Sequence, residues 1–320
     1  MRGSESPHRR RSRSFAGLVA LGVVVILAAS AIVSLGLGRV RAILGQPQGS
    51  ATSATAAPEP SCEPGPWDCA QRTRFEAATA LVTKQTGHIN MVVRDRQTGA
   101  VWSAGESTYI IWAGSTPKLA VAATLLEQAR AREITLDPKV RGQIDAALAV
   151  SDNNAADALW NRYVQPVAFM QRLRDLYGMK TATYVSGFPT RWGFIKCTSS
   201  DLAALMSYIL DTLDAEDRAY LIHAMRTVGA IQMWGVWSAG ASLWPGVKGG
   251  WSQEKDAGRT HWITATVGFA GPDERYVVAA MYHQLPGGDT IDHGVHVLSD
   301  LVATVFGAPV PAPVVVPDNQ

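Results

Sequence analysis

The stretch from Ala113 to Leu126 constrains the fold most, because it joins a helix start to a long apolar run. Ser115 suits an N-cap or first-turn position, and Pro117 suits the first turn, where its missing N–H costs nothing. Lys118 follows Ser115 by three residues, so both side chains lie on one helix face. A buried helix start also supplies free N–H groups and a positive potential. The stretch therefore predicts a serine nucleophile with an amine beside it.

Two later motifs support a catalytic interpretation of this Ser-x-x-Lys pattern, which by itself arises often by chance. Ser151-Asp152-Asn153 is the second motif, and Lys248-Gly249-Gly250, at the start of a strand pattern, is the third. In this order the three resemble the motifs of class A β-lactamases and penicillin-binding proteins. The resemblance extends from about Phe75 to Gly307 and includes the order of helices and strands.

The resemblance implies catalytic roles for three side chains in acyl transfer. Ser115 is the expected nucleophile. Lys118 is expected to take its proton if the amine is neutral, a state that burial and a second nearby cation both favour. Ser151 is expected to pass a proton to the departing nitrogen. Asp152, between the second motif's other residues, is expected to be structural, as an acceptor for backbone N–H groups.

The remaining motif residues are expected to bind the substrate. Asn153 has both a donor and an acceptor, which suits it to hold a substrate amide. Lys248 is the second cation and could also hold a substrate carboxylate. The resemblance places the oxyanion hole at the N–H groups of Ser115 and Trp251, with Gly250 beside them, and such donors lower a barrier by about 3–4 kcal/mol each.

The sequence departs from the class A pattern in three places. The interval from Ser115 to Ser151 is short for the family, so one wall of the cleft is expected to be open. Gly249 stands where a threonine or serine hydroxyl is usual, which puts a hydrogen bond to a substrate carboxylate in doubt. Between Phe169 and Ser200 there is no glutamate to activate a deacylating water. Efficient turnover of a penicillin is therefore not supported, and a penicillin-binding protein is equally compatible.

Each motif also has a structural interpretation. Lys118 and Lys248 could be solvated surface lysines, Ser-Asp-Asn could be a helix N-cap, and Lys-Gly-Gly could be a turn. The tryptophans near the third motif could stack on a sugar or ring of a cell-wall ligand, although core packing is the more common role. No histidine pair has ligand spacing with a third partner, so the sequence predicts no metal and no cofactor. Taken as an ordered triplet, the motifs favour catalysis.

The hydrophobic periodicity predicts an α/β fold, an α+β sandwich. An early hairpin and three late strands would form one five-stranded antiparallel sheet, flanked by helices, with a helical subdomain between them in sequence. The strands are expected at 89–95, 100–104, 246–251, 261–269 and 275–282, and the flanking helices at 72–85 and 290–306.

The N-terminal part reads as a membrane anchor and a spacer. Residues 1–14 form a basic tail, and residues 15–38 carry no charge over a length that can span a bilayer. The preceding arginines predict a cytoplasmic N-terminus and an exported domain. The alternative is a signal peptide cleaved after Ala29-Ser30-Ala31. Residues 39–70 are rich in Pro, Ala, Ser, Thr and Gly and read as a flexible linker.

Cys62 and Cys69 lie at the end of this linker, where a disulfide is expected in an oxidising compartment, with two free thiols as the alternative. Residues 71–308 would form the hydrolase domain and residues 309–320, with four prolines, a disordered tail. A net charge of +2 over 320 residues argues against nucleic-acid binding.

The sequence thus predicts a membrane-anchored, extracytoplasmic serine hydrolase that forms an acyl-enzyme on a β-lactam or a cell-wall peptide amide. The alternative is a non-catalytic or slowly deacylating penicillin-binding or sensor domain on the same scaffold, and a structural membrane protein with coincidental motifs is a third, weaker possibility.

Overall fold

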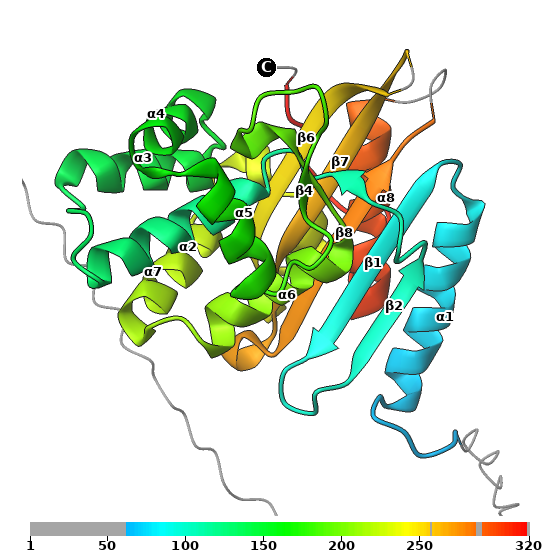
Figure 1. The fold of residues 1–320 in the computed structure, drawn as a ribbon. Helices are drawn as coiled ribbons and strands as arrows, with labels where there is room; N and C mark the ends of the chain where they lie inside the picture. The colour runs from blue at the N-terminus through cyan, green and yellow to red at the C-terminus, as the bar shows by residue number, and fades with distance from the viewer. Residues whose placement is uncertain (1–61, 257, 286–289, 319–320) are drawn as a thin grey trace, which may run out of the picture. The chain divides into compact units, whose positions relative to one another are not determined.

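A five-stranded antiparallel sheet forms the centre of the computed structural model, which describes residues 62–256, 258–285 and 290–318 (Figure 1). The strand order is β2-β1-β8-β7-β6. The early hairpin joins the late meander through β1 and β8, where His88 pairs with His283 and Asp95 with Tyr276. This confirms the predicted sheet. The strands are β1 (His88–Asp95), β2 (Val101–Gly105), β6 (Gly246–Asp256), β7 (Arg259–Ala270) and β8 (Tyr276–His283).

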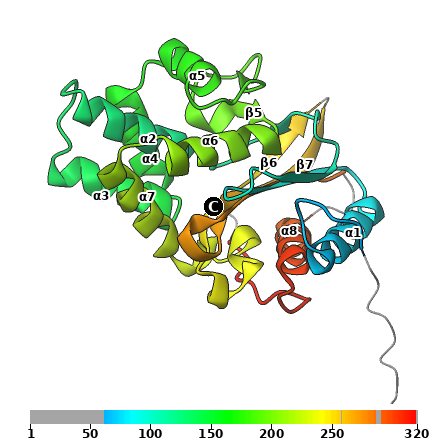
Figure 2. The same ribbon diagram turned by 90° about the horizontal axis from the view of Figure 1, so that it is seen from below.

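Helices cover both faces of the sheet (Figure 2). Along β1, alternate side chains enter different cores: Met91 and Val93 pack toward α1 (Cys69–Lys84) and α8 (Ile291–Phe306), whereas Val92 packs toward the central helices. This alternation follows from the two-residue period of a strand. It produces two hydrophobic cores, one on each side of the sheet.

The central helical block lies on the face opposite α1 and α8. Its central helix is α2, in which every residue from Pro117 to Leu126 is buried, as expected of a helix that is apolar on all sides. A small sheet of order β3-β5-β4 packs beside it. The block comprises α2 (Pro117–Arg130), α3 (Pro138–Ala149), α4 (Asn153–Tyr163), α5 (Pro166–Asp175), α6 (Ser199–Asp211) and α7 (Ala215–Arg226), with β3 (Ile111–Trp112), β4 (Thr183–Tyr184) and β5 (Ile195–Cys197).

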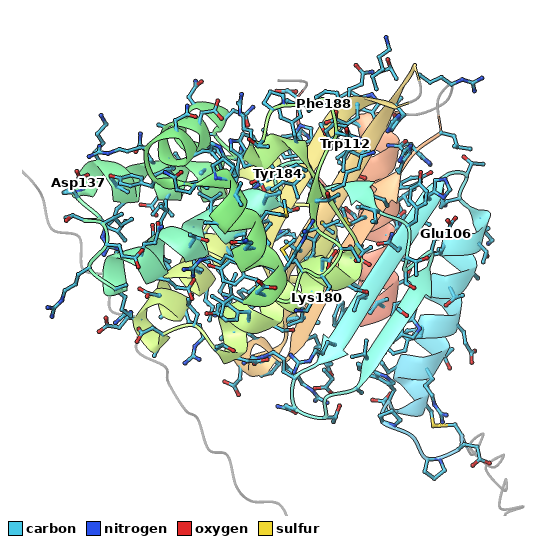
Figure 3. The ribbon with its side chains drawn as sticks, viewed as in Figure 1. Glu106, Trp112, Asp137, Lys180, Tyr184 and Phe188 are labelled. Carbon is cyan, nitrogen blue, oxygen red and sulfur yellow. A yellow bond between two sulfur atoms is a disulfide. The ribbon has the colours of Figure 1, made fainter. Side chains whose placement is uncertain are left out.

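Trp112 of β3 lies close to Phe188, in the loop between β4 and β5 (Figure 3). The rings of Trp112 and Phe188 meet edge to face with centroids 5.4 Å apart. Edge-to-face pairs stabilise a contact beyond the area they bury. The pair holds the loop before β5 against β3, the strand that leads to Ser115.

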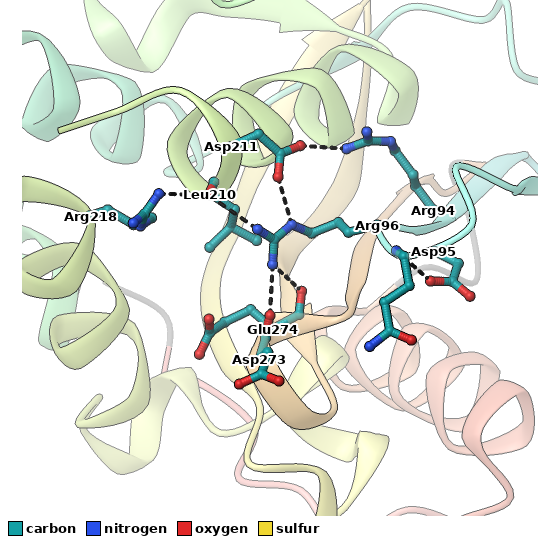
Figure 4. A network of polar contacts seen from close by, with 9 residues as sticks. Arg94, Asp95, Arg96, Leu210, Asp211, Arg218, Asp273 and Glu274 are labelled. Atoms are coloured by element: carbon teal, nitrogen blue, oxygen red, sulfur yellow. Dashed lines mark hydrogen bonds and ion pairs between the residues drawn. The ribbon is translucent and has the colours of Figure 1, made fainter. Parts of the chain in front are cut away.

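Arg96 links the β1–β2 hairpin to the helical block (Figure 4). Its Nε donates to Asp211 Oδ1 at 2.8 Å, and Arg94 donates to the other oxygen of the same carboxylate. Arg96 also donates to the backbone carbonyls of Asp273 and Glu274 at 2.7 and 2.9 Å. Arg96 also donates to the carbonyl of Leu210 at 3.1 Å, so these bonds fix α6 against the end of the sheet.

The two ends of the domain differ in how well they follow expectation. Cys62 and Cys69 form the expected disulfide, and α1 begins at Cys69, two residues before the expected domain boundary. Residues 309–318 do not form the loose tail that we expected. Ala312 is buried and donates its N–H to Asp300 Oδ1 at 2.7 Å, so the segment packs on α8.

The expected anchor at 15–38, the basic tail and most of the linker lie outside the described residues. Within the described ranges, no helix is both long enough and apolar enough to span a bilayer.

Candidate active site

Ser115 lies at the mouth of α2, directly after β3. The N–H of Ala113 donates to Ile195 of β5 at 2.9 Å, which fixes the chain as it enters the turn. Gly114 then takes a φ of +54°, a conformation that favours glycine. Thr116 is the residue before the helix, and the N–H of Lys118 donates to the carbonyl of Ser115 at 3.2 Å. Ser115 therefore stands just before the first turn, with 9% of its surface exposed.

The third motif lies in backbone contact with this turn. A Cβ added to Gly250 would lie 2.6 Å from the nitrogen of Ser115, and one added to Gly114 would lie 2.9 Å from the nitrogen of Trp251. Two glycines therefore allow β6 and the Ser115 turn to approach each other. The two N–H groups expected to form the oxyanion hole lie at this contact.

The direction of the Trp251 N–H follows from Gly249. The N–H of Gly249 donates to the side chain of Gln232 at 2.8 Å, so it points away from the neighbouring strand β7. N–H groups two residues apart on a strand point the same way. The N–H of Trp251 therefore faces the open edge of β6, on the side where the Ser115 turn lies.

The second motif forms a strained junction between α3 and α4. Ser151 has a φ of +60°, which is uncommon for a residue with a side chain and typical of functional sites. Asp152 caps α4 by accepting the N–H of Ala155 at 2.7 Å, the structural role expected of it. Asn153 is the first residue of α4. The junction directs the side chains of Ser151 and Asn153 toward Lys118.

Lys118 is buried, with 1% of its surface exposed, and its amine meets the second motif. Its Nζ donates to Asn153 Oδ1 at 2.8 Å, to Ser151 Oγ at 3.2 Å and to the backbone carbonyl of Ser151. Among the hydrogen bonds of the described residues, none joins Lys118 Nζ to Ser115 Oγ. The structure thus brings the two motifs together, while the amine engages Ser151 in place of the expected nucleophile.

Lys248 is fully buried and its amine reaches the same hydroxyl. Its Nζ donates to Ser151 Oγ at 3.1 Å, to Gln232 Oε1 at 3.0 Å and to the carbonyl of Gly249. Neither lysine is the solvated surface residue of the structural interpretation. Both amines converge on Ser151.

Burial sets the protonation of both amines. Loss of water around Lys118 lowers its pKa to about 7, although the carboxylates of Asp152 and Asp157 act in the opposite direction. Burial also holds the pKa of Lys248 well below its ordinary value of 10.5, and the neighbouring Lys118 lowers it further. A neutral amine, the form that can accept a proton, is thus accessible near neutral pH.

Trp192 covers the Lys118 amine, and its position could not be read from the motifs. Its ring centroid lies 4.3 Å from Lys118 Nζ, and its indole N–H donates to Asp157 Oδ1 at 2.8 Å. Asp157 lies on α4, one turn after Asn153, and also pairs with Arg191 at 2.5 Å. Helix α4 therefore contacts Lys118 directly through Asn153. It also acts on Lys118 indirectly, because Asp157 holds Trp192 over the amine.

Gln232 is a second residue that sequence reasoning missed. It lies in the short 3₁₀ turn η2 (Ala230–Gln232), is fully buried, and its Oε1 accepts from both Lys248 and the Gly249 N–H. The only signal in the sequence was its position within the tryptophan-rich segment before the third motif. Its side chain fixes both the second lysine and the edge of β6.

These residues border a cleft of about 410 Å³. Aspartate and glutamate are absent from the described residues that line it, and Asp175, the one aspartate between Phe169 and Ser200, lies in α5. The region that was expected to lack a deacylating glutamate contributes Trp192 and Gly193. The lining residues are Gly114, Ser115, Ser151, Asn153, Trp192, Gly193, Trp251, Ser252, Gln253 and Trp262.

The fold is similar to that of class A β-lactamases and of PBP-A. The chain matches almost the whole length of several solved structures with this fold. An ancestral class A β-lactamase matches with a TM-score of 0.60 at 19% identity, covering 73% of this chain and 99% of that protein. A β-lactamase from Chitinophaga pinensis matches with 0.60 at 15% identity, covering 74% and 98%. The structure of PBP-A matches with 0.59 at 17% identity, covering 73% and 95%.

Sequence comparison finds mycobacterial relatives. Proteins named "Putative lipoprotein LppW" from Mycobacterium tuberculosis and Mycobacterium bovis are 27% identical over 215 residues. The match covers 64% of this chain and 66% of those proteins, just under two thirds of their length. No family model matches the sequence.

Proposed function

We propose that the domain is a serine acyltransferase or hydrolase that opens an amide bond and keeps the acyl group on Ser115. The observation that carries the proposal is the convergence of two buried lysine amines on Ser151 Oγ, beside a cleft that Ser115 lines. Burying two amines is costly, and an unconnected structural role for both would leave that cost unexplained. The fold shared with β-lactamases and PBP-A supports the same chemistry.

In this proposal, Ser115 Oγ attacks the carbonyl carbon of the substrate amide, forming a C–O bond. Neutral Lys118 takes the hydroxyl proton, for which its amine must turn from Ser151 toward Ser115, in the turn that precedes α2. The N–H groups of Ser115 and Trp251 receive the negative charge that develops on the carbonyl oxygen.

The C–N bond then breaks, and the leaving nitrogen needs a proton. Ser151 suits this step because its hydroxyl is hydrogen-bonded to both Lys118 and Lys248. Lys118 can return a proton to Ser151 as Ser151 donates its own to the nitrogen. The product is an ester of Ser115 and a free amine, so protons and bonds balance.

The absence of a carboxylate from the described cleft lining favours slow hydrolysis of that ester. Water at a serine ester needs a base to remove its proton. We therefore propose a long-lived acyl-enzyme on a β-lactam or a cell-wall peptide, as in a penicillin-binding or sensor protein, in preference to rapid β-lactam turnover. A wholly non-catalytic sensor on the same scaffold is the second candidate.

We also propose that the domain works outside the cytoplasmic membrane, attached by residues 15–38 and joined by residues 39–70. The uncharged run, the Cys62–Cys69 disulfide and the lipoprotein name of the mycobacterial relatives support this location.

Labelling with a fluorescent penicillin tests the proposal. The wild-type domain should carry the label through denaturing electrophoresis, and the folded Ser115→Ala variant should not. Equal labelling of both proteins, or none of the wild type, would reject the assignment of Ser115. Membrane fractionation of the full chain, with and without residues 1–38, tests the anchor.

A further inference from the structure

We propose that the cleft selects acyl donors without a free carboxylate beside the scissile bond, such as an amide within a peptide or an ester of a β-lactam acid. The inference rests on the proposed acyl transfer and names the substrate class for the same site. The third motif and the lining of the cleft support it.

Lys248 has no donor left for a substrate carboxylate. Even when it is protonated, a lysine amine has three N–H donors and no more. Ser151 Oγ, Gln232 Oε1 and the Gly249 carbonyl accept from all three. The side chain is fully buried, so a carboxylate could reach it only by displacing one of these oxygens.

Position 249 leaves no space for the hydroxyl side chain that is usual in the family. A Cβ on Gly249 would lie 2.7 Å from Cζ2 of Trp234 and 3.3 Å from Oε1 of Gln232. Both side chains are fully buried and belong to the segment that precedes β6. They fill the position from which a hydroxyl would bind a carboxylate.

The groups that do face the cleft are neutral. No described lining residue has a charged side chain, and Arg191, next to Trp192, is paired with Asp157. A carboxylate placed in the cleft would lose water without gaining a cation, which is costly. The tryptophan rings that line the cleft suit a flat or cyclic group of the substrate.

The test compares benzylpenicillin with its methyl ester. The rate at which each acylates the wild-type domain is measured by intact mass and divided by its rate of hydrolysis in hydroxide, which corrects for reactivity. The ester should react at least tenfold faster on this corrected scale. Equal rates, or a faster acid, would overturn the inference, although the proposed function would stand. No Ser115 adduct from either compound would reject the proposed function and the inference together.

A double variant tests whether the third motif sets this preference. Trp234→Ala with Gly249→Ser removes the nearest atoms and supplies the hydroxyl, so the corrected ratio of ester to acid should fall at least fivefold. The single Gln232→Ala variant, which frees Lys248 without supplying the hydroxyl, should show a smaller fall. An unchanged ratio in the folded double variant would overturn the assignment. If the double variant does not fold, the wild-type comparison decides.

Discussion

Lys118 and Lys248 donate hydrogen bonds to the same oxygen, the hydroxyl of Ser151, over 3.2 and 3.1 Å. Two ammonium groups around one acceptor repel each other, and burial disfavours the charge on each. The pair is therefore arranged to favour a neutral amine at the pH where most enzymes work. This single relationship links the second motif to both the first and the third, and several predictions depend on it.

Acylation of Ser115 should depend on pH through Lys118. Burial lowers the pKa of this amine to about 7, so the neutral base appears as the pH rises through that value. The acylation rate should rise about tenfold per pH unit below pH 7 and level off above it. The measurement is the rate of adduct formation by intact mass between pH 5.5 and 9. A rate that does not change over this range would contradict the role of Lys118.

The same lowered pKa predicts a pH-dependent stability. Between a folded pKa of about 7 and the ordinary 10.5, the unfolded chain binds the extra proton, so stability increases with pH. The free energy of unfolding of the wild type, relative to Lys118→Met, should rise by up to about 1.4 kcal/mol per pH unit. Urea unfolding at pH 7, 8 and 9 measures it. Lys139→Met, at an exposed site, is the matched control, and a flat difference for Lys118→Met would count against a neutral buried amine.

Asp157 should raise the pH at which the acylation rate reaches half of its maximum. Its charge raises the pKa of Lys118, and it also holds Trp192 over the amine. Asp157→Asn should therefore shift the midpoint to lower pH. The exposed Asp175 on α5 supplies the control, since Asp175→Asn should leave the profile in place. A midpoint that moves upward in Asp157→Asn would show that the electrostatic argument has the wrong sign.

Gly250 should tolerate no side chain. A Cβ there would lie 2.6 Å from the nitrogen of Ser115, which would separate the two oxyanion donors. Gly250→Ala should lower the acylation rate at least a hundredfold, as the loss of one such donor does in other enzymes. Gly142→Ala, in the middle of α3 with open space around it, is the control. It should stabilise the fold by about 0.5–1 kcal/mol and keep full activity. Retention of activity in Gly250→Ala would remove the oxyanion assignment.

Deacylation should respond to a carboxylate introduced at Gly193. This residue lines the cleft and has nothing within 4 Å of an added Cβ. Gly193→Glu should shorten the lifetime of the penicillin adduct at least tenfold, because a base could then activate water. Gly193→Gln has the same shape without the charge and should leave the lifetime unchanged. Equal lifetimes in all three proteins would indicate that water access, and not the missing base, limits hydrolysis.

The sequence predicted most of the fold because its apolar residues follow patterns that extend over whole elements. The alternation along β1 and the uninterrupted apolar run of α2 each specify a burial pattern, and the structure shows both. The tail was misjudged because four prolines indicate only the lack of a helix. They do not reveal that the N–H of Ala312 meets Asp300.

The candidate site was predictable only as far as its motifs extend. Ordered motifs identified both lysines, but the packing around them depends on single distant residues without a local pattern. Gln232 lies in a 3₁₀ turn. Trp192 donates a hydrogen bond to Asp157, which is 35 residues away in the sequence. The bond from Lys118 to Ser151 in place of Ser115 depends on a choice of side-chain conformation, which spacing on a helix does not specify.

Time-resolved intact-mass measurement of the domain with benzylpenicillin, followed by peptide mapping of the adduct, tests the central claim most directly. The account predicts one covalent adduct, on the peptide that contains Ser115, which forms faster as the pH rises through 7 and persists for many minutes after excess drug is removed. An adduct on another residue, or a folded protein that stays unmodified at every pH, would contradict it.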